Sequence, residues 1–132
     1  MPSFGKVSKQ RLSTCDKPLI DLFNEVVKHF DCFVVCGTRS KEDQEAAFNA
    51  GNSKLHYPNS KHNNLPSKAI DVAPYLNGAI NWDPRECLYF AGVVKGIAAM
   101  MGIKIRYGGD WDSDNNIIEN KFNDLVHFEI LE

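Results

Sequence analysis

Several features that define other protein classes are scarce in this sequence of 132 residues. It has only four cysteines and no Cys-x-x-Cys pair, so neither a disulfide framework nor a zinc-finger spacing is indicated. We expect Cys32 and Cys36, which flank an apolar stretch, to be buried free thiols in a reducing compartment. No repeat, low-complexity tract or linker interrupts the chain, which predicts a single domain spanning residues 1–132.

Charge of one sign is not in excess, because 15 Lys and Arg stand against 17 Asp and Glu, for a formal net charge of -2. A nucleic-acid-binding domain needs a basic surface that neutralises phosphates, so we do not expect that function. The N-terminal residues lack the apolar core of a signal peptide, and the longest apolar stretch, residues 90–101, is too short to span a bilayer. We therefore expect a protein made in the cytoplasm, without stable membrane association. We also expect it to be a monomer.

Apolar spacing and capping residues predict alternating helices and strands along the chain. Long polar loops separate them at residues 52–68 and 108–120, and long loops in compact domains tend to be functional. Such an order predicts an α+β fold, a small, mainly antiparallel sheet backed by helices. Helices are expected at residues 17–30, 40–50 and 83–101, and strands at residues 32–36, 69–73, 103–107 and 126–131.

Two histidines and an aspartate form a competent set of zinc ligands: His62, Asp71 and His127. Two imidazoles and one carboxylate leave a fourth position open for water, as in catalytic zinc sites, and zinc lowers the pKa of that water to about 7. Asp124 precedes the last strand and is placed to act as the general base, with Glu129 as the alternative. Each residue also has an ordinary interpretation as surface polarity or a satisfied buried group, and composition alone leaves both open.

Five short segments occur in the order that a known family has them: GTRSKEDQ at 37–44, SKH at 60–62, AID at 69–71, RYGGDWD at 106–112 and DLVH at 124–127. Together they resemble the M15 family of zinc peptidases, which includes D-Ala-D-Ala peptidases and phage L-alanyl-D-glutamate endopeptidases. That family shares its fold with the Hedgehog signalling domain. The resemblance therefore implies the same fold, and it implies that the histidines and the aspartate named above hold zinc.

The same resemblance implies roles for three further residues. Asp124 matches the catalytic acid/base, Arg39 the arginine that steadies the substrate carbonyl or carboxylate, and Ser60 a serine beside the substrate. Without the resemblance, the sequence is equally consistent with Arg39 as a surface residue and with Ser60 as a residue whose hydroxyl caps the local backbone. The nine-residue step from His62 to Asp71 has no glycine and is longer than the family usually shows, which alters the rim of the site.

The GGDW segment favours the phage branch of the family. The implied activity is hydrolysis of the L-Ala–D-Glu bond in peptidoglycan stem peptides. The enzyme would act on the cell wall after the membrane has been permeabilised, during phage-mediated lysis. One alternative is a D-Ala-D-Ala carboxypeptidase or dipeptidase. Another is a noncatalytic, zinc-containing wall-binding module, against which Asp124 argues, because a pure binding module has no use for a general base.

The polar loop before the last strand resembles the first half of an EF-hand calcium loop. Oxygen-bearing side chains stand at alternate positions, but the twelfth position is Lys121 in place of the bidentate Glu. The ordinary interpretation is a solvated acidic turn. The calcium hypothesis takes as ligands Asp110, Asp112, Asp114, Asn116 and Glu119.

Overall fold

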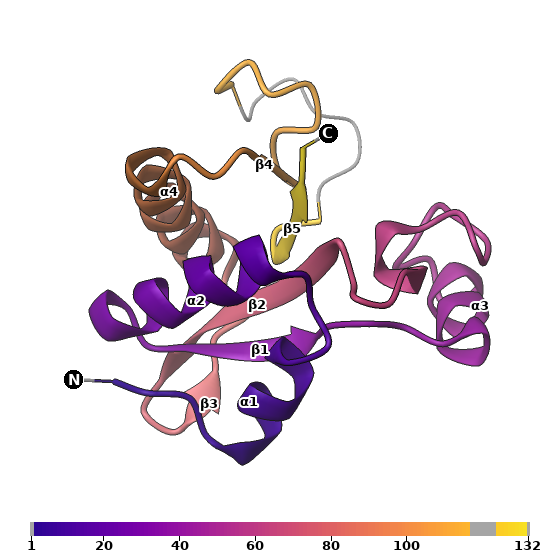
Figure 1. Ribbon diagram of the computed structural model, residues 1–132, viewed down its shortest axis with the longest axis horizontal. Helices are drawn as coiled ribbons and strands as arrows, with labels where there is room; N and C mark the ends of the chain where they lie inside the picture. The colour runs from indigo at the N-terminus through magenta and orange to yellow at the C-terminus, as the bar shows by residue number, and fades with distance from the viewer. Residues whose placement is uncertain (1, 117–123, 132) are drawn as a thin grey trace.

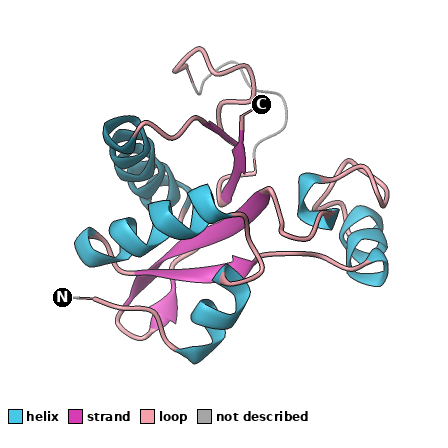
Figure 2. Ribbon diagram, viewed as in Figure 1, coloured by secondary structure: helices cyan, strands magenta, loops and turns pink. Residues whose placement is uncertain are grey.

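The computed structural model describes residues 2–116 and 124–131, and helices and strands both contribute to its fold (Figures 1 and 2). The helices are α1 (Lys6–Leu12), α2 (Lys17–His29), α3 (Lys41–Asn49) and α4 (Pro84–Met101), with a 3-10 turn η1 (Lys61–Asn63). The strands are β1 (Cys32–Cys36), β2 (Ala69–Leu76), β3 (Ala79–Ile80), β4 (Ile105–Tyr107) and β5 (His127–Ile130).

The strands form one sheet in the order β1-β2-β5-β4, and β3 pairs with β2 as a short hairpin. Every pairing between these strands is antiparallel. The expected α+β architecture with a small antiparallel sheet is therefore confirmed.

One face of the sheet is covered by α2 and α4, and Phe128 of β5 lies at the centre of this packing. The Phe128 ring contacts Phe23 of α2 at a centroid distance of 5.5 Å and Phe90 of α4 at 6.2 Å. Because side chains alternate along a strand, the neighbours of Phe128, His127 and Glu129, point to the opposite face. That face is directed away from the hydrophobic core, and α3 with the loop around η1 lies apart from α2 and α4 (Figure 1).

Local signals account for the elements that the sequence predicts. The Ser40 hydroxyl accepts a hydrogen bond from the Asp43 amide, so it caps α3 as expected. Pro18 stands in the first turn of α2, and α4 ends at Gly102 in the left-handed conformation. The four cysteines are free thiols, three of them buried, whereas Cys36 is only half-buried.

The structure also contains elements that the sequence analysis did not predict. Helix α1 buries only Ser8 and Leu12, so it shows no apolar periodicity that would reveal it. Strand β2 continues through Pro74 to Leu76, although a proline without an N–H normally favours the end of a strand. Among the described residues, no helix combines the length and the apolar character needed to cross a membrane.

Candidate active site

The strand register places two rows of side chains side by side on the face of the sheet opposite the core. In both rows the residues lie directly across from one another on three adjacent strands, where side chains come within contact distance. The first row is Cys36, Asp71 and His127, and the second is Ala69, Glu129 and Arg106.

Three potential ligand atoms converge over the first row, because η1 brings His62 to it from the loop. His62 Nε2 lies 3.2 Å from Asp71 Oδ1 and 3.3 Å from His127 Nδ1. The third side of this triangle, between His127 Nδ1 and Asp71 Oδ1, is 3.2 Å. All three residues are buried, so water screens their interaction only weakly.

The outer nitrogens of both imidazoles are held by acceptors, which decides the tautomers. His62 Nδ1 donates to the Gly37 carbonyl at 2.8 Å, and His127 Nε2 donates to the Glu129 carboxylate at 2.8 Å. In the neutral rings, the nitrogens that face Asp71 therefore carry lone pairs. Three acceptors that point at one another fit a cation between them, and such outer hydrogen bonds are typical of metal-ligating histidines.

The electrostatics of the cluster lead to the same conclusion. Burial lowers the pKa of His62, but the Asp71 carboxylate outweighs it and raises this pKa to about 10. For His127 too, burial is outweighed by hydrogen bonds to Asp71 and Glu129, so its pKa is raised. Burial raises the pKa of Asp71, yet the adjacent histidines hold it well below its usual range. Without a metal the cluster thus retains a proton that a bound cation would displace.

Asp124 and Cys36 flank these three residues. Potential ligand atoms lie within 4.8 Å of one another in two groups of three residues. The first group is Cys36, His62 and Asp71, and the second is Asp71, Asp124 and His127. Asp124 Oδ2 lies 3.9 Å from His127 Nδ1. Burial, together with the Asp71 charge, raises the pKa of Asp124 to about 6. A carboxylate with this pKa beside a metal is suited to general acid–base chemistry.

The backbone of Gly108 holds Asp124 beside His127. The Gly108 amide donates to the His127 carbonyl at 2.8 Å, and its carbonyl accepts from the Asp124 amide at 2.9 Å. A Cβ atom at Gly108 would come within 2.1 Å of the Asp124 carbonyl oxygen. This close approach explains why the GGDW segment has glycine here.

Arg39 and Ser60, which lie in different loops, each contact one residue of the triangle. Arg39 contacts Asp71 Oδ2 at 3.2 Å, and its other nitrogen donates to Gln44 Oε1 at 2.9 Å. Gln44 is fully buried, which explains its place in the GTRSKEDQ segment. The Ser60 hydroxyl accepts from the His62 amide at 3.2 Å and so caps η1. This contact agrees with the ordinary interpretation of Ser60 as a capping residue, although Ser60 also lines the cavity at the site.

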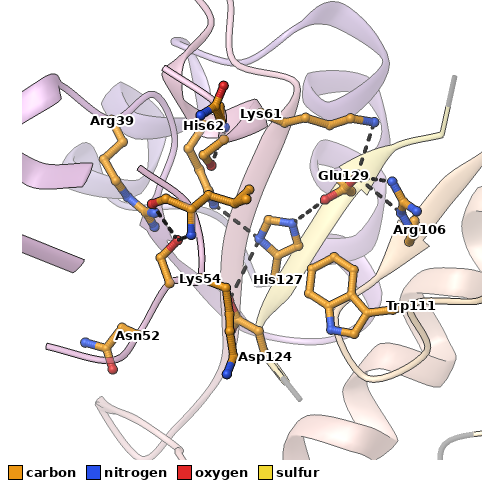
Figure 3. A pocket seen from close by; sticks show the side chains of 14 residues that line it. Arg39, Asn52, Lys54, Lys61, His62, Arg106, Trp111, Asp124, His127 and Glu129 are labelled. Carbon is orange, nitrogen blue, oxygen red and sulfur yellow. Dashed lines mark hydrogen bonds and ion pairs between the residues drawn. The ribbon is translucent and has the colours of Figure 1, made fainter. Parts of the chain in front are cut away.

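Glu129 connects His127 to two cationic side chains that the sequence analysis did not single out. Its Oε2 atom lies 3.0 Å from Arg106 Nη2 and 3.2 Å from Lys61 Nζ (Figure 3). Burial raises the pKa of Glu129, but His127, Arg106 and Lys61 together lower it to about 2. Glu129 is therefore ionised with both oxygens engaged, which suits the orientation of His127 better than a role as general base. Arg106 reaches Glu129 because the two residues pair directly across β4 and β5. The sequence does not contain this strand register, so it could not reveal the contact.

Two cavities open onto the site. The first has a volume of about 400 Å³ and is lined by His62, His127 and Asp124. Trp111 also lines it, with its ring centroid 5.2 Å from that of His127. Four cationic side chains contribute to the same lining: Arg39, Lys54, Lys61 and Arg106 (Figure 3). The second, of about 480 Å³, shares Arg39, Asn52 and Asp124 with the first. The two cavities therefore border the same three residues at the site.

The acidic loop forms a separate cluster. Asp110, Asp112 and Asp114 place potential ligand atoms within 4.8 Å of one another. The Asp110 carboxylate accepts from the Asn115 amide at 2.9 Å, and Lys95 Nζ lies 3.5 Å from it. Asn116 uses its amide to donate to Asp114 at 2.8 Å, and Glu119 lies outside the described residues.

Comparison with known proteins relates this site to a family. The sequence model of the phage L-alanyl-D-glutamate peptidase family matches residues 2–131. The chain is 32% identical over 118 residues to the L-alanyl-D-glutamate peptidase of Escherichia phage T5, covering 86% of this chain and 84% of the relative. Its fold resembles the crystal structure of the Serratia marcescens L-Ala D-Glu endopeptidase ChiX, with a TM-score of 0.75 and 23% identity, over 97% of this chain and 89% of the other.

Proposed function

The chain belongs to the phage L-alanyl-D-glutamate peptidase family, and from this we propose that it is a zinc-dependent endopeptidase of peptidoglycan. Its substrate is the stem peptide, and the bond that it hydrolyses is the one between L-Ala and D-Glu. It acts as a monomeric, single-domain endolysin on the host cell wall, after the membrane has been permeabilised.

The observation that carries the proposal is the triangle of His62 Nε2, Asp71 Oδ1 and His127 Nδ1, with edges of 3.2, 3.2 and 3.3 Å. Zinc binds nitrogen and oxygen at about 2.0–2.1 Å in tetrahedral geometry, so two of its ligands are separated by roughly 3.3–3.4 Å. Three protein ligands leave one position open for substrate or water, as catalytic zinc sites require.

Asp124 carries the proton during hydrolysis. When bound, zinc polarises a carbonyl oxygen and makes water more acidic. Asp124, ionised above its pKa of about 6, takes the proton from the attacking water and delivers it to the leaving nitrogen of D-Glu. Arg39 holds the outer oxygen of Asp71 and borders both cavities, so it orients a ligand and steadies the substrate carbonyl.

Digestion of purified cell walls tests this proposal. The zinc-loaded protein should clear walls in a zymogram, and mass spectrometry of the soluble products should find new N-terminal D-Glu and new C-terminal L-Ala. Release of free D-Ala would instead identify a D-Ala-D-Ala carboxypeptidase or dipeptidase. Wall binding without any cleavage would identify a noncatalytic zinc-containing module.

For the acidic loop we propose a weak calcium site formed by Asp110, Asp112 and Asp114, with Asn116 and Glu119 as further candidate ligands. The loop precedes Asp124 in the sequence, so a bound ion would help to fix the catalytic carboxylate. Calorimetric titration of zinc-loaded protein should give binding heat at millimolar calcium, which the Asp112→Ala/Asp114→Ala double variant should lose. Absence of heat in the unaltered protein, with lysis unaffected by a calcium-selective chelator, would leave only an acidic turn.

A further inference from the structure

The first cavity carries a surplus of positive charge on one wall. Lys61 and Arg106 both contact Glu129 Oε2, at 3.2 and 3.0 Å, so two cations share a single carboxylate. The remaining oxygen of Glu129 accepts from His127, which is neutral when it binds a metal. The group of three side chains therefore keeps a net charge of about +1 beside the metal ligands.

This wall is accessible to a ligand. The side chains of Arg106 and Lys61 are 34% and 26% exposed, whereas that of Glu129 is 8% exposed, so the cations lie toward the cavity and the carboxylate behind them. Arg106 uses Nε and Nη2 for Glu129, and its Nη1 group has no hydrogen-bond partner among the described residues. A guanidinium with spare donors is well suited to hold an anionic oxygen.

The second cavity has a different character. Apart from the shared Arg39, its described lining contains no Lys or Arg, and the side chains that distinguish it include Val35, Trp82 and Val126. A substrate that spans both cavities would therefore place its anionic part in the first cavity and its uncharged part in the second.

The stem peptide has this asymmetry around the bond between L-Ala and D-Glu. D-Glu continues the chain through its γ-carboxyl group, which leaves an α-carboxylate close to the scissile nitrogen, whereas L-Ala brings only a methyl group. On the basis of the proposed function, we infer that Arg106 and Lys61 bind this free α-carboxylate. They make the enzyme selective for stem peptides with D-Glu over those in which the carboxylate is amidated to D-isoglutamine. L-Ala and the glycan side then lie in the second cavity.

Two muropeptides that differ only at this group test the inference directly. The probes are disaccharide tetrapeptides that carry either D-Glu or D-isoglutamine, and kcat/KM is measured for each by mass spectrometry of the products. The zinc-loaded enzyme should cut the D-Glu substrate on the order of ten- to a hundredfold faster, as expected when a hydrogen bond to a charged group is lost. Equal rates would overturn the inference, and failure to cut either substrate would overturn the proposed function as well.

The Arg106→Gln variant separates binding from a merely structural effect through Glu129. Glutamine can still donate to Glu129 but lacks the charge, so kcat/KM for the D-Glu substrate should fall toward that for the amide, which should change little. Lys61→Gln should show the same pattern more weakly. The matched control is Arg85→Gln, at the start of α4 and 92% exposed, which should keep the full preference. An equal loss on both substrates in Arg106→Gln and Lys61→Gln would return these cations to a structural role.

Discussion

The hydrogen bonds behind the imidazoles govern what the site can bind. The Gly37 carbonyl and the Glu129 carboxylate each take an N–H, and the two free nitrogens are thereby directed toward Asp71. A carbonyl or carboxylate behind the ring also makes the facing nitrogen more basic. Under the proposed function, the three side chains are thus oriented before a metal binds, which lowers the entropic cost of binding it.

Removal of any one ligand should abolish stoichiometric zinc binding. His62→Ala, Asp71→Ala and His127→Ala each leave two protein ligands, too few for a tight site. Zinc analysis by mass spectrometry after dialysis measures the effect, and zinc should no longer raise the melting temperature. His29→Ala is the matched control, because His29 lies at the exposed end of α2, outside the site, and this variant should retain zinc. Full zinc content in one of the alanine variants would remove that residue from the site.

Asp124 offers a way to separate binding from catalysis. Asp124→Asn should keep the fold and the zinc, but lose on the order of 10²–10⁴-fold in kcat, because the amide can neither accept nor return the proton. Steady-state kinetics on a defined muropeptide, beside zinc analysis of the same sample, measures both quantities. Near-normal turnover in this variant would mean that the proton is carried by another group.

At the scale of elements, Gly108, which directly follows β4, holds Asp124 beside β5. Gly108 pairs through its backbone with both Asp124 and His127, and no side chain fits between them. The two strands and this glycine therefore act as one unit that sets the distance from the Asp124 carboxylate to the His127 ring.

Gly108→Ala should damage both stability and activity. Its Cβ would lie 2.1 Å from the Asp124 carbonyl oxygen, so the backbone must move, at a cost of about 1–3 kcal/mol. Thermal unfolding followed by circular dichroism, with wall-lysis assays, measures the two effects. Gly96→Ala in α4 is the control: its Cβ meets nothing within 4 Å, and the helix should gain roughly 0.5–1 kcal/mol. Equal stability of the two variants would contradict the assigned role of Gly108.

At the scale of the whole molecule, the buried thiols link stability to alkaline pH. Burial raises the pKa of Cys15 from 9.0 to about 12 and raises that of Cys32 further. Above pH 9 the unfolded chain loses these protons while the folded chain keeps them, so the free energy of unfolding falls as pH rises toward about 12. The full contribution is present below pH 9.

Replacement of both thiols should therefore reduce the decrease in the free energy of unfolding as the pH rises above 9. In the Cys15→Ala/Cys32→Ala variant, the free energy of unfolding will be lower at pH 7 because two buried side chains are truncated, but it should decline less between pH 9 and 11. Each raised thiol accounts for up to about 1.4 kcal/mol per pH unit. Urea denaturation at several pH values provides the measurement, and parallel declines in the two proteins would contradict the assignment.

Much of the local structure follows from the sequence because its causes are local. Ser40 caps α3 with the amide three residues on, and Gly102 ends α4 in a left-handed conformation. The residue types at 62, 71 and 127 are among those that bind zinc, and their place in the family motifs indicates metal chemistry. These signals need no knowledge of where distant segments lie.

The geometry of the site depends on contacts that no local pattern contains. Asp71 and His127 are 56 residues apart in the chain and meet only because β2 and β5 pair in this register. A slip of one residue would turn Phe128 toward the site and His127 into the core. The partners of Glu129 could not be predicted from the sequence either. Arg106 contacts it from another strand, and Lys61 contacts it from η1. The sequence by itself thus determined which chemistry was available, whereas the antiparallel pairing of distant strands decided which groups act together.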